Sequence, residues 1–142
     1  MIQAKNISRF YGDLQVLKGI DISIKPSEVV SITGASGAGK TTLLQILGTL
    51  DKPNTGEVLI NGQDIFSLKE QKLADFRNQH IGFVFQFHHL LPEFSCLENV
   101  CIPGFIGKRK VADVEKQARE LLAYLKMDHR MDHKPSELSG GE

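Results

Sequence analysis

The chain has 142 residues, which is enough for one domain with its own hydrophobic core. Hydrophobic residues make up 41% of it and charged residues 24%, and no apolar run reaches the roughly 20 residues that span a bilayer. Its 17 basic and 17 acidic side chains cancel, so no basic field attracts nucleic acid and we expect no nucleic-acid partner.

Alternating apolar and polar residues predict two antiparallel strands over 2–10 and 16–24, joined by a turn at Tyr11, Gly12 and Asp13. The first residues lack the apolar core of a signal peptide, and we therefore expect the protein in the cytosol. After a break at Pro26, the β-branched run over 29–33 predicts a buried strand.

The segment after this strand matches the phosphate-binding P-loop pattern of Gly, four residues, Gly, Lys and Ser or Thr. Its residues are Gly34, Ala35, Ser36, Gly37, Ala38, Gly39, Lys40, Thr41 and Thr42. A helix predicted over 43–47 completes the strand–loop–helix context that the motif requires. Backbone N–H groups of the loop and the N-terminus of the helix favour the binding of a phosphate. Lys40 should reach the β- and γ-phosphates, and the Thr41 hydroxyl should bind Mg²⁺. The sequence therefore predicts a site for ATP with Mg²⁺.

Turn residues over 51–56 precede a predicted strand at 57–60, which the turn signal Asn61-Gly62 closes. Ser67 and Glu70 have capping-box spacing and predict a helix that continues towards Asn78. A second buried strand is predicted over 81–85 and leads directly into Gln86.

The sequence predicts that the rest of the chain is helical. Ser95 and Glu98 form another capping box. A helix over 111–126 should bury the apolar residues Val111, Val114, Ala118, Leu121, Leu122 and Leu125. The two cysteines, Cys96 and Cys101, should be reduced, half-buried thiols, and the histidines are too few and scattered for a metal site. We therefore divide the chain into a β/α nucleotide-binding part, 1–87, and a helical part, 88–142.

The last residues, Leu138-Ser139-Gly140-Gly141-Glu142, resemble the signature sequence of ABC-type ATPases when taken with the P-loop. Gln86 resembles the glutamine of that family's Q-loop, and Tyr11 resembles the A-loop aromatic that stacks on adenine. Four motifs in the right order make the resemblance specific. It implies an α/β fold, with a P-loop NTPase core, an antiparallel β-subdomain and an α-helical subdomain.

Within the family, four segments resemble the branch that serves lipoprotein release and macrolide export: 48–53, 78–86, 90–92 and 97–100. Residues 87–92 look most like the ATP-binding subunit of the lipoprotein-releasing (Lol) system. The resemblance implies an ATPase of an ABC transporter, a homodimer that sandwiches ATP, and transmembrane permease partners at the cytoplasmic face of the inner membrane. Lys40 and Gln86 would then act in catalysis, and Thr41 and Gln86 would bind Mg²⁺. Ser139, Gly140 and Gly141 would contact the nucleotide of the neighbouring subunit.

Other functions remain open at this point. They are a related macrolide or peptide exporter, a cell-division ABC ATPase, or a nucleotide-binding module without catalysis. Family members continue beyond the signature with the Walker B strand, the catalytic glutamate, the D-loop and the switch histidine, together with further strands of the parallel sheet. We therefore expect residues 1–142 to be the N-terminal portion of one ABC domain, with no neighbours for the P-loop strand and no hydrolysis by this portion alone.

Overall fold

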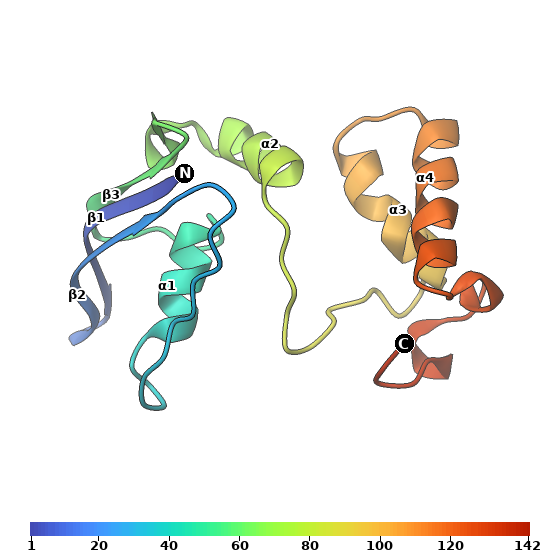
Figure 1. Ribbon diagram of the computed structural model, residues 1–142, viewed down its shortest axis with the longest axis horizontal. Coiled ribbons are helices and arrows are strands. Elements are labelled where there is room, and N and C mark those ends of the chain that lie inside the picture. Colours follow the sequence, from blue (N-terminus) through green and yellow to red (C-terminus); the bar gives the residue numbers. More distant parts are fainter. The chain divides into compact units, whose positions relative to one another are not determined.

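The computed structural model describes all residues from 1 to 142, and the chain divides into two compact units, Met1–Ile81 and Gly82–Glu142. The first unit holds all the strands and the helices α1 and α2, and the second holds α3 and α4 (Figure 1). None of the helices combines the length and the apolar character that a membrane crossing requires.

The first unit is built on one antiparallel sheet with the strand order β2-β1-β3-β4. Its members are β1 (Ile2–Tyr11), β2 (Leu14–Ile24), β3 (Thr55–Ile60) and the two-residue β4 (Gln63–Asp64). The predicted hairpin and the strand at 57–60 are confirmed, while β4 was not predicted. Tyr11 is the last residue of β1, paired with Leu14, rather than part of the turn.

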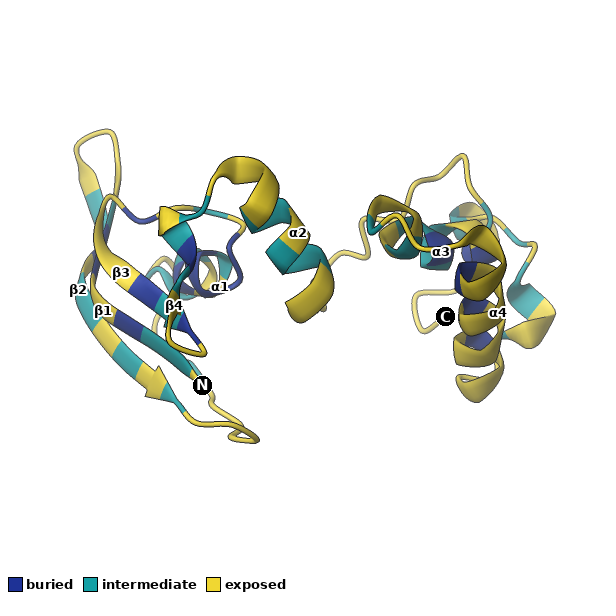
Figure 2. Ribbon diagram, turned by 90° about the horizontal axis from the view of Figure 1, so that it is seen from above, coloured by how far each residue is buried: buried dark blue, intermediate teal, exposed yellow.

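The core of the first unit lies between this sheet and α1 (Lys40–Leu47). The helix is confirmed and begins three residues before the predicted start. Ile46 and Leu43 of α1 join buried residues of β1 and β3, whose buried stretches are dark blue in Figure 2. The complete buried cluster consists of Ala4, Ile7, Leu17, Leu43, Ile46, Leu47, Val58, Ile60 and Ile65.

The buried strands predicted over 29–33 and 81–85 are wrong, because neither segment pairs with a strand of the sheet. Val29 is 98% exposed and Val84 is fully exposed. An extended segment forms a buried strand only where neighbouring strands satisfy its N–H and C=O groups. The segment before the P-loop therefore has no neighbouring strand in this structure.

The capping box at Ser67 is also wrong. Ser67 ends a 3₁₀ turn, η1 (Ile65–Ser67), and its hydroxyl donates to the Asp64 carbonyl oxygen at 2.7 Å. The hydroxyl is therefore already engaged, and α2 (Glu70–His80) begins after Lys69 without a side-chain cap. Arg77 of α2 donates from Nη2 to the carbonyl oxygen of Thr49 at 2.6 Å, which ties α2 to the loop after α1.

In the second unit, α3 (Cys96–Ile106) begins at the predicted capping box. The Glu98 N–H donates to Ser95 Oγ at 3.3 Å, and the Ser95 N–H donates to Glu98 Oε2 at 2.7 Å. Helix α4 (Val111–Tyr124) follows, and two 3₁₀ turns, η2 (Asp128–Arg130) and η3 (Pro135–Glu137), complete the unit. Figure 2 shows the buried residues of α3 and α4 on the sides where the two helices pack.

Helix α4 buries a narrower face than the sequence predicts. Val114, Ala118 and Leu122 are buried, whereas Val111, Leu121 and Leu125 are exposed. A single neighbouring helix covers only one stripe of α4, so the residues beside that stripe stay in solvent. The helices approach closely at Gly104, where a Cβ atom would lie 2.7 Å from Val114 Cγ1.

Both cysteines are free, as predicted, but they are buried rather than half-buried. Cys96 and Cys101 belong to the core of the second unit together with Leu97, Val114, Ala118 and Leu122. Burial raises the pKa of both thiols because a thiolate is poorly solvated there. They therefore behave as small core side chains rather than as reactive groups.

Ile46→Ala should lower the free energy of unfolding by about 2–5 kcal/mol, because it removes a fully buried side chain between α1 and the sheet. Leu44→Ala on the same helix is the matched control, since Leu44 is 52% exposed, and should cost less than about 1 kcal/mol. Denaturant unfolding of both variants measures the difference. Equal losses would contradict the placement of the core.

Candidate functional site

The predicted P-loop forms a turn that leads directly into α1. Gly39 precedes the helix in the left-handed conformation, with φ 85° and ψ 11°. The Leu43 N–H donates to the Gly39 carbonyl oxygen at 2.8 Å, which starts the helical hydrogen bonds, and the Ala38 N–H donates to the Ala35 carbonyl oxygen at 3.2 Å. This geometry directs the free N–H groups at the start of α1 towards the loop.

The Lys40 side chain curls back over the loop that precedes it. Its Nζ donates to the carbonyl oxygens of Gly34 at 2.9 Å and Ala35 at 2.6 Å. A pocket of about 360 Å³ lies beside it. Its lining consists of Val16, Ser36, Gly37, Gly39, Lys40, Thr41 and Thr42. An ammonium group, three hydroxyl-bearing residues and a helix N-terminus around one pocket suit an anion such as a phosphate.

The loop beside the pocket packs closely on β2. A Cβ atom at Gly39 would lie 2.8 Å from both Val16 Cγ1 and Leu17 Cδ2, and 3.2 Å from the Val16 carbonyl oxygen. Gly39 therefore has two reasons to be glycine, the positive φ and the contact with β2. At Gly37 only the first reason applies, since φ is 77° and a Cβ atom would meet nothing within 4 Å.

Tyr11, the predicted adenine-stacking residue, lies in the same unit as the P-loop. Its hydroxyl donates to Asp51 Oδ2 at 2.9 Å, and the Arg9 guanidinium lies 4.8 Å from the centroid of its ring. Neither partner of Tyr11 can be predicted from the sequence. The residues around Asp51 predict only a turn. For Arg9, the one available signal is that a single residue separates it from Tyr11 on a strand, which puts both side chains on the same face.

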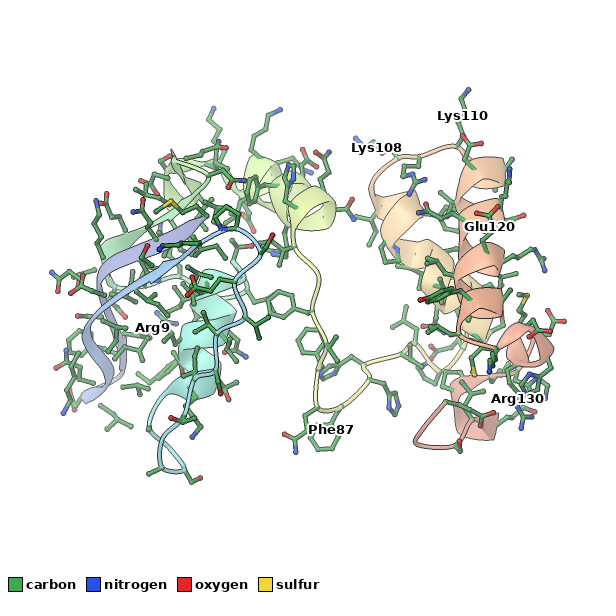
Figure 3. All side chains as sticks on the ribbon, in the orientation of Figure 1. Arg9, Phe87, Lys108, Lys110, Glu120 and Arg130 are labelled. Atoms are coloured by element: carbon green, nitrogen blue, oxygen red, sulfur yellow. The ribbon has the colours of Figure 1, made fainter.

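The other predicted site residues belong to the second unit. Gln86 is exposed in an irregular segment. Ser139, Gly140 and Gly141 form an exposed turn, in which the Ser139 N–H donates to Glu142 Oε2 at 2.8 Å. Arg130, labelled in Figure 3, donates from Nε to Glu142 Oε1, also at 2.8 Å. No local pattern of residues indicates this second contact.

These contacts lower the pKa of the Glu142 carboxyl from 4.5 to about 2. The largest cause is the N–H of Ser139, followed by the Ser139 side chain and by Arg130. The ionised carboxylate therefore holds the signature turn, residues 139–142, in the shape that the structure shows.

Gly39→Ala should destabilise the protein by about 1–3 kcal/mol more than Gly37→Ala, because only residue 39 adds a clash with β2 to the strain of a positive φ. Chemical denaturation of the two variants provides a matched comparison. If both lost the same free energy of unfolding, the packing of the loop on β2 would be irrelevant to stability.

The Glu142 carboxylate should stay ionised down to a pH of about 3, because its pKa is depressed in the folded state. The stability that this carboxylate gives to the turn is complete above its unfolded pKa of about 4.5 and is lost as the pH falls through about 2. Carboxyl-carbon NMR of Glu142 against pH measures the midpoint. Arg130→Gln should raise the pKa only part of the way, since the Ser139 bonds remain. A midpoint near 4.5 in the unmodified protein would contradict the contacts.

Comparison with solved structures places this fold among ATP-binding cassettes. A dimeric structure of the cassette MJ0796 in a post-hydrolysis state bound to ADP and Pi matches 99% of this chain and 64% of its own, with a TM-score of 0.89 and 39% identity. A second dimeric structure of MJ0796 matches equally well, at 40% identity. The α/β fold predicted from the sequence is therefore confirmed.

Curated relatives match along the whole chain. The lipoprotein-releasing system ATP-binding protein LolD of Cytophaga hutchinsonii is 55% identical over 142 residues, and those of Bacteroides fragilis and Bacteroides thetaiotaomicron are each 56% identical. The chain spans about 65% of the length of these relatives. The family model for ABC transporter matches residues 17–142. This chain therefore belongs to the ABC transporter family.

Proposed function

We propose that the full-length protein is the ATP-binding subunit of a lipoprotein-releasing ABC transporter, in which ATP binding and hydrolysis drive release through a membrane partner. The observation that carries the proposal is identity above one half, along the whole chain, to relatives named for that system. The P-loop pocket in front of α1 supplies a site where the phosphates would bind.

In this proposal, Lys40 exchanges partners when ATP binds. Its ammonium group now binds two neutral carbonyl oxygens of the loop, and phosphate oxygens are stronger acceptors because they carry charge. The N-terminus of α1 adds its partial positive charge to the same anion. Thr41, whose side chain lines the pocket, would hold Mg²⁺, which would neutralise charge on the phosphates.

The remaining predicted residues complete the site in the proposal. Tyr11 would stack on adenine with its exposed ring, and Gln86 would contribute to Mg²⁺ binding and catalysis. Ser139, Gly140 and Gly141 would bind the nucleotide held by the P-loop of a second subunit. Two observations support this last role: the matched cassettes are dimeric, and a Cβ atom at Gly140 or Gly141 would meet nothing within 4 Å, so a phosphate can approach their backbone.

The proposed location follows from the names of the relatives. These relatives are named as ATP-binding proteins of a lipoprotein-releasing system, and the nucleotide ATP is found in the cytosol. We therefore place the full-length protein at the cytoplasmic face of the inner membrane, bound to transmembrane permease subunits. We assign the permease contact to the part of the second unit near residues 87–103.

The proposal predicts that the P-loop of one subunit and the signature turn of the other serve the same ATP. Lys40→Ala in the full-length protein should abolish turnover, because the phosphates lose their cation. Ser139→Arg should spare ATP binding by the monomer and block turnover, because a long cation fills the space where small residues meet the γ-phosphate. Steady-state ATPase assays on each homodimer measure both effects.

Mixed dimers provide the matched control. A dimer of one Lys40→Ala subunit and one Ser139→Arg subunit carries both lesions in the same site, so its other site is intact and turnover should return. Placing both changes in one subunit, opposite an unmodified one, damages both sites and should abolish turnover. If the two arrangements had the same activity in an assay that detects one-site turnover, the signature turn would not act on the neighbour's nucleotide.

A further inference from the structure

Three side chains around Tyr11 contact one another in a closed set, which we call the Tyr11 triad: Arg9, Tyr11 and Asp51. The Tyr11 hydroxyl donates to Asp51 Oδ2 at 2.9 Å. Arg9 Nη2 donates to the other carboxylate oxygen, Oδ1, at 2.8 Å. The Arg9 guanidinium also lies 4.8 Å from the centroid of the Tyr11 ring, within the range of a cation–π contact. Each member therefore holds the other two.

The triad joins two parts of the first unit that are far apart in sequence. Arg9 and Tyr11 are two residues apart on β1 and so share one face of the strand. Figure 3 marks Arg9 beside the strands. Asp51 lies in the loop that follows α1, where the Leu50 N–H donates to the Gln45 carbonyl oxygen at 2.8 Å. The same loop contacts β1 a second time, because the Phe10 N–H donates to Asn54 Oδ1 at 2.9 Å.

Burial within the triad is uneven. The side chains of Arg9 and Asp51 are only 22% and 21% exposed, whereas Tyr11 is 47% exposed. Arg9 Nε is buried and has no hydrogen-bond acceptor, which costs free energy in a folded protein. Arg9 therefore lies against the Tyr11 ring although its Nε donor has no acceptor. Stability alone does not explain this arrangement. Nearly half of Tyr11 nevertheless remains exposed to solvent.

We propose that Asp51 and Arg9 are positioning residues, which hold the Tyr11 ring in the orientation that stacks on the base of the bound nucleotide. The proposal rests on the proposed function, in which Tyr11 contacts adenine. An exposed tyrosine otherwise samples several rotamers, and fixing it on binding costs conformational entropy. The triad removes that cost in advance. Since Asp51 follows α1 and Lys40 begins it, one short helix sets both the base end and the phosphate end of the site.

The test compares two ligands on the full-length protein, ATP and inorganic tripolyphosphate, which has the phosphates without the base. Tyr11→Phe keeps the ring and removes the hydroxyl that Asp51 accepts. Asp51→Asn keeps a side chain of the same size and removes the charge that pairs with Arg9. Each change should weaken ATP binding roughly two- to tenfold, the range of one net hydrogen bond, and leave tripolyphosphate binding unchanged. The variant that carries both changes should bind ATP with the affinity of whichever single variant binds it less tightly. The reason is that both changes act through the same contact.

Glu57→Gln is the matched control. It breaks an ion pair on the same sheet, between Lys5 Nζ and Glu57 Oε1 at 3.1 Å, and should change neither affinity. Equal weakening of ATP and tripolyphosphate by Asp51→Asn would overturn the proposal, since that pattern indicates a general structural defect. Tyr11→Ala distinguishes the stacking role of Tyr11 from the positioning role of Asp51 and Arg9. If it weakens ATP binding while Tyr11→Phe and Asp51→Asn do not, the positioning role fails and the stacking role stands. If Tyr11→Ala leaves ATP affinity unchanged, the stacking role itself fails.

Discussion

The contact between α1 and the antiparallel sheet is the constraint on which the first unit depends. Ile46 packs with Ile7 and Val58 in the centre of the buried cluster. The helix has eight residues and is therefore roughly 12 Å long, and its buried residues Leu43, Ile46 and Leu47 hold it against the sheet along half of that length, which fixes both of its ends. At the N-terminal end the P-loop packs on β2, and at the C-terminal end Asp51 meets β1. The hydrophobic core thus sets the distance between the two halves of the proposed nucleotide site.

Features whose cause is local could be predicted from the sequence. The hairpin of β1 and β2 follows from alternation and turn residues, and α3 begins at Ser95 because two neighbouring side chains cap it. The conformation of the P-loop also has a local cause, because its glycines adopt the positive φ values that the loop requires. In each case the residues that decide the conformation lie within a few positions of one another.

Features that depend on a distant partner could not be predicted in the same way. The runs at 29–33 and 81–85 have the composition of buried strands, but composition does not supply a neighbouring strand. Ser67 has the spacing of a cap, but its hydroxyl binds Asp64 instead. In the site, Tyr11 could be recognised by its resemblance to a family motif. Arg9 and Asp51 could not, because only the folded chain brings them together.

The close approach of α3 and α4 at Gly104 restricts how the second unit can diverge among relatives. A methyl group at position 104 would overlap both γ-carbons of Val114, and neither backbone can move without disturbing the buried residues along the helix pair. The two positions must therefore change together. A relative with alanine at the first requires a residue smaller than valine at the second, or a wider spacing between its helices. We therefore expect these two positions to covary among relatives, for a reason that lies in helix packing and is independent of nucleotide chemistry.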